Sequence, residues 1–120
     1  PLLPRRPFEF VGCFADSGER DFSDEHLAPG QHSAVFCDDW CRDFEYFALQ
    51  MQGECRCGNE YSTREEYIQV PAGQCAEPCT EGGTSDPIWY SYAPCGSSWR
   101  NAVYRTSHAK RTDRQPPARG

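Results

Sequence analysis

The apolar residues of this chain gather in short runs, separated by stretches that are polar or rich in proline and glycine. Residues 8–15 are rich in aromatic and β-branched types and predict a first strand. A second strand is predicted at 44–51, and the turn at Gln52-Gly53 leads into a third at 54–58. A closing strand is predicted at 101–105.

A short helix is predicted over about residues 34–43, with Ser33 as its N-cap. Four residues recur at helical spacing and predict its apolar face: Val35, Phe36, Trp40 and Cys41. Trp40 is therefore expected in the core. Three carboxylates are expected to face solvent: Asp38, Asp39 and Asp43.

The segments between these elements are expected to be irregular. Residues 16–32 are polar, and 59–99 are punctuated by proline and glycine. Residues 1–7 contain three prolines and predict an extended arm, because proline fixes φ and removes a backbone donor. The predicted organisation is an arm at 1–7, one domain at 8–105 and a basic polar tail at 106–120.

Eight cysteines in 120 residues predict four disulfides and a compartment outside the reducing cytosol. Cys37 and Cys41 lie one helical turn apart, so both sulfurs point to the same neighbour. Cys55 and Cys57 lie two apart in an extended segment and project to one side. The two pairs are expected to face each other as a double staple between helix and strand, and the spacing leaves open which sulfur bonds which.

The net charge of −6 conceals an uneven distribution. Residues 7–99 hold four basic and seventeen acidic residues, a balance of −13, whereas 1–6 carry +2 and 100–120 carry +5. An acidic body argues against nucleic acid, whose phosphates would be repelled. No apolar run approaches the length of a membrane-spanning helix.

Basic termini on an acidic body raise the alternative of a self-assembling extracellular structural protein. Its termini would dock on the body of the next copy and generate head-to-tail filaments. The residues that would make these contacts are Arg5, Arg6, Lys110, Arg111 and Arg114. The simpler alternative is that both termini are solubilising linkers.

The local neighbours of the cysteines carry a family resemblance. In chain order they are Gly12-Cys13, Cys37-x3-Cys41, Phe44-x-Tyr46-x-Ala48-Leu49-Gln50, Glu54-Cys55-x-Cys57-Gly58, Cys75-x3-Cys79, Cys95-Gly96 and Val103-Tyr104. This order resembles the WSC domain, a family of extracellular modules of fungal cell-wall stress sensors and Kremen-type receptors, also found beside carbohydrate-active enzymes. The chain departs from the family pattern in an aromatic insert at 88–92 and at Ser97, where the family often has a second glycine.

The resemblance implies a small disulfide-rich α+β fold related to PAN/apple modules, with a short antiparallel sheet packed on one helix and long irregular loops. It implies four bridges: Cys13–Cys75, Cys37–Cys55, Cys41–Cys57 and Cys79–Cys95. The middle two agree with the staple expected from the spacing. It further implies a secreted or cell-surface module that binds polysaccharide or glycoprotein glycans, for attachment to a cell wall, matrix or glycocalyx.

Sugar binding needs aromatic faces for the C–H surface of pyranose rings and polar side chains for the hydroxyls. Candidates gather around Cys95: Trp89, Tyr90, Tyr92 and Trp99, with Asp86 and Asn101 nearby. The alternative is that some of these rings fill the small core. Tyr61 and Tyr67 flank a polar loop and are weaker candidates, expected to be solvated.

Nothing in the sequence marks a catalytic centre, so the chain is expected not to be an enzyme. No carboxylate pair is singled out for glycoside hydrolysis, and no Gly-x-Ser-x-Gly supports a serine nucleophile. Neither the paired acids nor the histidines have ligand spacing, so no metal or cofactor is expected. Neither Asn59 nor Asn101 lies in an N-glycosylation motif, whereas O-linked modification of the arm and tail stays open.

Overall fold

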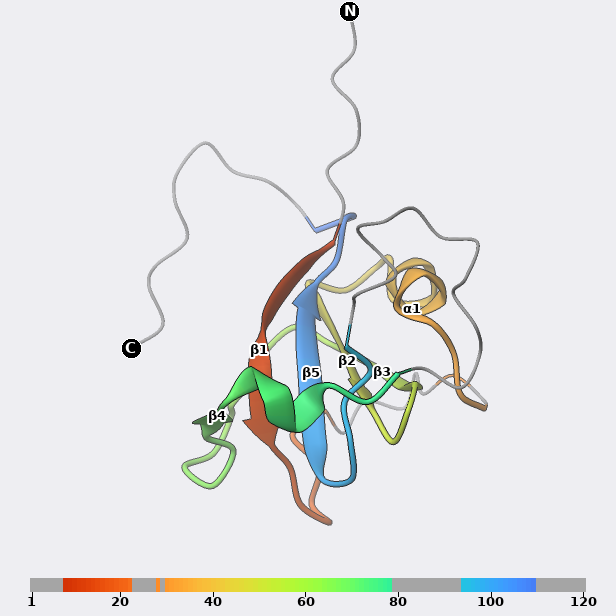
Figure 1. Ribbon diagram of the computed structural model, residues 1–120. Helices are drawn as coiled ribbons and strands as arrows, with labels where there is room; N and C mark the ends of the chain where they lie inside the picture. The colour runs from red at the N-terminus through yellow and green to blue at the C-terminus, as the bar shows by residue number, and fades with distance from the viewer. Residues whose placement is uncertain (1–7, 23–27, 29, 79–93, 110–120) are drawn as a thin grey trace, which may run out of the picture.

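The computed structural model describes residues 8–22, 28, 30–78 and 94–109 (Figure 1). Five strands form one antiparallel sheet in the order β3-β2-β5-β1-β4. The strands are β1 (Glu9–Ala15), β2 (Tyr46–Gln50), β3 (Glu54–Gly58), β4 (Gln69–Val70) and β5 (Arg100–Arg105). They are accompanied by the α-helix α1 (Ala34–Trp40) and the 3₁₀ helix η1 (Ala72–Cys75). The predicted small α+β fold, with a sheet packed on one helix, is confirmed.

The last strand, β5, lies in the middle of the sheet between β1 and β2 (Figure 1). Val103 is in register with Gly12 of β1 on one side and with Ala48 of β2 on the other. The C-terminal strand therefore joins β1 to the β2–β3 hairpin, because β1 and β2 are not paired with each other. The sequence did not predict β4 or η1, which lie in the stretch expected to be irregular.

Helix α1 begins as predicted, because the backbone N–H of Phe36 donates to Ser33 Oγ at 3.1 Å. It ends at Trp40, before the predicted end at 43. The prediction that Asp38 faces solvent is wrong. Its carboxylate is buried, because it accepts from the backbone N–H of Ser107 at 2.8 Å and from the hydroxyl of Ser107 at 2.6 Å. Val35, predicted on the buried face, is exposed.

Two adjacent disulfides, Cys37–Cys55 and Cys41–Cys57, join α1 to β3 as predicted. A third, Cys13–Cys75, joins β1 to η1. Cys95 is also disulfide-bonded, but its predicted partner Cys79 lies outside the described residues. The sulfurs of Cys37, Cys41 and Cys55 lie within 4.8 Å of one another, yet each belongs to a bridge, so none is a thiolate ligand for a metal.

The face of the sheet that packs against α1 forms the larger core, which includes Phe47, Leu49, Ala102, Tyr104 and the disulfides. Tyr104 stacks on Phe47 with 4.8 Å between ring centroids. Its hydroxyl donates to the carbonyl oxygen of Pro94 at 2.6 Å, and burial raises the pKa of Tyr104. Trp40 is half-buried and packs against the edge of this core.

The opposite face of the sheet is also covered, by a second cluster of Phe14, Phe22, Ala48, Tyr61 and Val103. Tyr61 and Tyr67 are both buried, so the prediction that they are solvated is wrong. The loop that carries them is anchored to Asp21, which accepts from the backbone N–H groups of Ser62 and Thr63 and from the hydroxyl of Thr63. These contacts fold the loop back onto the sheet.

Residues 106–109, which the sequence assigns to the tail, pack on the domain. The hydroxyl of Thr106 donates to the carbonyl oxygen of Phe44 at 2.7 Å, and Ala109 is buried. Within the described ranges, no helix has both the length and the apolar character to cross a membrane.

Candidate functional site

An exposed tryptophan stands on the tight turn that leads into β5. Ser97 and Arg100 exchange two backbone hydrogen bonds, at 3.1 and 3.2 Å, and enclose Ser98 and Trp99. Trp99 has a φ of +56°, in the left-handed region that costs a residue with a side chain about 1–2 kcal/mol. The residue is 45% exposed. A large aromatic residue thus occupies a backbone position that suits glycine, with much of its ring in solvent.

The indole of Trp99 rests against the guanidinium of Arg20, whose central carbon lies 4.8 Å from the ring centroid. This is a cation–π contact, which also fixes the orientation of the ring. Arg20 is held in turn by the carboxylates of Asp16 at 3.5 Å and Glu54 at 3.9 Å. The guanidinium occupies one face of the ring, so a ligand would stack on the other.

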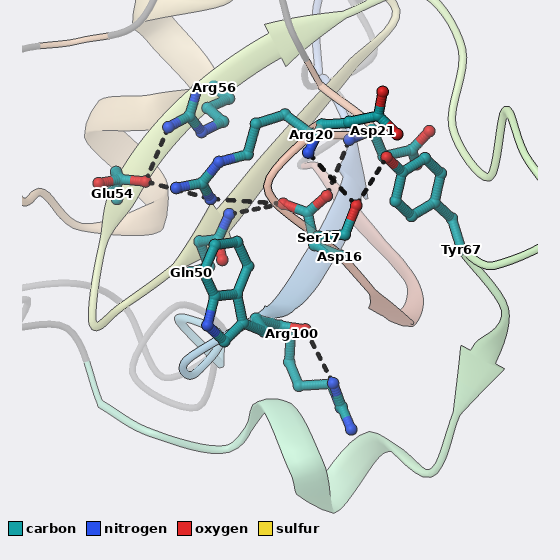
Figure 2. A network of polar contacts seen from close by, with 11 residues as sticks. Asp16, Ser17, Arg20, Asp21, Gln50, Glu54, Arg56, Tyr67 and Arg100 are labelled. Carbon is teal, nitrogen blue, oxygen red and sulfur yellow. Dashed lines mark hydrogen bonds and ion pairs between the residues drawn. The ribbon is translucent and has the colours of Figure 1, made fainter.

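Asp16 connects the turn to the rest of the sheet (Figure 2). Its backbone N–H donates to the carbonyl oxygen of Trp99 at 3.0 Å. Its buried carboxylate accepts from Gln50 Nε2 and from the backbone N–H of Asp21, both at 2.8 Å. The segment after β1, the end of β2 and the turn before β5 therefore meet at one residue, Asp16.

Arg100, the residue after Trp99, bonds through its guanidinium to neutral acceptors; Figure 2 shows one of these bonds. Nε donates to Gln74 Oε1 at 2.7 Å, and Nη1 donates to the carbonyl oxygen of Trp99 at 2.9 Å. Two hydrogen bonds hold this guanidinium, one of them to the backbone of Trp99 itself. We refer to the five residues Asp16, Arg20, Gln50, Trp99 and Arg100 as the Trp99 platform.

The sequence profile of the WSC domain matches residues 10–97 of the chain. The chain belongs to the WSC domain family. A "WSC domain-containing protein" of Arthroderma benhamiae is 28% identical over 106 residues, which is 88% of this chain and 13% of that protein. The chain therefore spans about an eighth of the length of this relative.

WSC domains are carbohydrate-binding-type modules of extracellular or cell-surface proteins and are generally non-catalytic. The disulfide-rich fold described above fits such a location. The profile match includes Asp16, Arg20 and Gln50 and ends at Ser97, two residues before Trp99. Three of the five platform residues therefore lie inside the family match, and the tip of the turn lies beyond it.

Of the six predicted sugar contacts in this WSC domain, the structure describes Trp99 and Asn101. Trp99 is exposed as a ligand contact requires, whereas Asn101 is 0% exposed, inside β5. The prediction that Asn101 is a surface contact is wrong, because Asn101 is buried within the sheet. Four predicted contacts lie outside the described residues and stay predictions: Asp86, Trp89, Tyr90 and Tyr92.

The sequence analysis missed the residues that support Trp99. Asp16 and Arg20 stand in a segment read as a polar loop, and Gln50 ends a strand. The one available signal was the opposite charge at 16 and 20, four residues apart, but this spacing indicates a pair only on a helix. Segments far apart in the sequence meet here, and no local motif encodes that.

Proposed function

We propose that this WSC domain binds glycans without catalysis through the Trp99 platform, and so attaches the protein that carries it to a cell wall or matrix. The observation that carries the proposal is the exposed indole of Trp99 on a left-handed backbone position, backed by Arg20. Backbone strain of this kind persists where surrounding structure enforces it, and it clusters at functional sites. An exposed aromatic face is the group that packs on the C–H surface of a pyranose.

The contacts behind the indole favour binding because they fix the ring before a ligand arrives. Arg20 covers one face, and the hydrogen bond from Asp16 to the carbonyl oxygen of Trp99 holds the turn. A ring already held in place loses little conformational freedom on binding, so more of the stacking energy contributes to affinity. One small platform gives weak binding, which repetition of modules along a chain would strengthen.

A glycan-array screen on the oxidised domain, followed by pull-down with the polysaccharides that score, tests this proposal. The variant Trp99→Ala is expected to lose binding. Val35→Ala, which shortens an exposed apolar side chain on α1, is the matched control and is expected to bind as the wild type does. If a folded Trp99→Ala protein still binds, the Trp99 platform is not the glycan-binding site.

The filament alternative rests on Arg5, Arg6, Lys110, Arg111 and Arg114, all of which lie outside the described residues. It stays a prediction. Comparing the molecular mass in solution of the chain with and without residues 1–7 and 110–120 tests it, because a monomer in both cases would contradict it.

A further inference from the structure

We propose that the Trp99 platform prefers glycans that carry a carboxylate, and that Arg100 is the residue that recognises this group. The inference rests on the proposed function, because it names a ligand class for the same surface. It predicts a uronic acid, whose carboxylate projects from the edge of the pyranose ring, stacked on Trp99 with its charge against Arg100.

Arg100 differs from the other arginines in the described part of the chain. Five others have a guanidinium nitrogen within 4.0 Å of a carboxylate oxygen: Arg20, Arg42, Arg56, Arg64 and Arg105. Arg100 has no such ion pair within the described residues and bonds only to an amide oxygen and a backbone carbonyl. In a body where residues 7–99 carry a balance of −13, a guanidinium without a carboxylate partner has its charge available for a ligand.

The geometry of Arg100 suits a carboxylate. A guanidinium has five N–H groups in a planar fork. The bonds to Gln74 Oε1 and to the carbonyl oxygen of Trp99 use two of them, so three stay available. These two bonds also hold the side chain, so binding costs less rotamer entropy than it would for a free arginine. Arg pairs with carboxylates through parallel N–H···O bonds, which are stronger than neutral hydrogen bonds.

Among the described residues, the carboxylates that contact Arg20 are already engaged and offer little competition. The side chain of Asp16 is 0% exposed and accepts from Gln50 and Arg20. Glu54 lies 3.0 Å from Arg56 and 3.9 Å from Arg20. Repulsion by the wider acidic body acts over longer distances, and salt at physiological strength screens it beyond about 8 Å. Recognition of an acidic sugar by the turn is therefore compatible with the acidic body.

Two soluble probes that share one backbone test the inference: oligogalacturonate and its fully methyl-esterified form, which is uncharged. Affinities are measured by calorimetry on the full oxidised chain at physiological salt. The wild type is expected to bind the acid about tenfold more tightly than the ester, as one charged hydrogen-bonded contact implies. Equal affinities for the acid and the ester would overturn the inference.

Arg100→Gln is expected to abolish the preference, so that the acid and the ester bind with equal affinity. Arg42→Gln is the matched control, because it makes the same charge change at an exposed arginine paired with Asp39 on the helix side; it is expected to change neither affinity. Arg100→Lys keeps the charge and is expected to retain a smaller preference for the acid. An Arg100→Gln protein that keeps the preference, or loses both ligands equally, would contradict the assignment.

Trp99→Ala separates this inference from the proposed function. If that variant binds both probes like the wild type, the platform itself is wrong. If it loses both, while the wild type binds acid and ester equally, the platform stands and only the carboxylate preference fails.

Discussion

Replacing Tyr104 with phenylalanine tests how the strand that carries the Trp99 turn is anchored. The ring of Tyr104 is fully buried, and its hydroxyl donates to the carbonyl oxygen of Pro94 at 2.6 Å. Tyr104→Phe keeps the stacking on Phe47 and removes this one buried hydrogen bond. The free energy of unfolding is expected to fall by about 1 kcal/mol at neutral pH.

The same substitution has an opposite effect in alkali. An unfolded tyrosine ionises near about pH 10, whereas burial raises the pKa of Tyr104 in the folded protein. The folded state then holds a proton that the unfolded state loses. The contribution of Tyr104 to stability is therefore fully present below about pH 10 and falls by up to about 1.4 kcal/mol per pH unit above it. Phenylalanine carries no such dependence, so the two proteins are expected to be equally stable at about pH 10.7.

Urea unfolding of both proteins between pH 7 and 11, with the disulfides intact, measures this difference. All other ionisations are common to the two proteins and cancel. The expected result is a deficit of the variant that shrinks with pH and then changes sign. A deficit that is independent of pH, or that grows with pH, would refute the argument that Tyr104 stays protonated in the folded core.

Two further pairs of variants test the fold, each by urea unfolding. Gly96→Ala is expected to lower the free energy of unfolding by about 3 kcal/mol or more. Gly96 has a φ of +77°, and an added Cβ would lie 2.1 Å from a backbone oxygen of β2. Its control is Gly73→Ala, which has open space around it and is expected to change the free energy of unfolding by less than about 0.5 kcal/mol. Asp38→Ala removes two hydrogen bonds to Ser107 and is expected to lower the free energy of unfolding by about 2–3 kcal/mol. Its control is Asp39→Ala at the neighbouring exposed position, which is expected to leave the free energy of unfolding almost unchanged. Equal losses within either pair would contradict the assigned contacts.

The parts of the fold that the sequence predicted are those encoded by short-range spacing. Cys37 and Cys41 on one helical face, with Cys55 and Cys57 on one side of a strand, led to the staple between α1 and β3 that the structure contains. The N-cap at Ser33 was found for the same reason, since a cap is a local contact between residues three positions apart.

The errors lie where distant segments meet. The burial of Asp38 depends on Ser107, which is 69 residues away in the sequence. Tyr61 and Tyr67 were placed in solvent because their loop is polar, but the sheet has a second covered face that the loop closes. Strand β2 is buried on both faces along most of its length, so alternation of apolar and polar residues did not reveal that face.

The candidate site was predicted only through its most conspicuous residue. Trp99 was selected for its aromatic ring, which is a property of the residue type. Its left-handed backbone, its contact with Arg20 and its link to Asp16 are properties of the assembled sheet. Among the described residues Arg100 has no carboxylate partner, and the sequence could not predict this, because it depends on which distant residues the fold brings near each arginine.

The most direct test of the account is a nitrogen–proton NMR titration that follows the indole N–H signals of Trp99 and Trp40 as soluble oligosaccharides are added to the full oxidised chain. Oligogalacturonate and a soluble β-glucan serve as probes, and the Trp99→Ala protein assigns the signal. The account predicts a saturable shift of the Trp99 signal while that of Trp40, packed against the core, stays in place. A Trp99 signal that stays unchanged while an oligosaccharide binds elsewhere on the domain would contradict it.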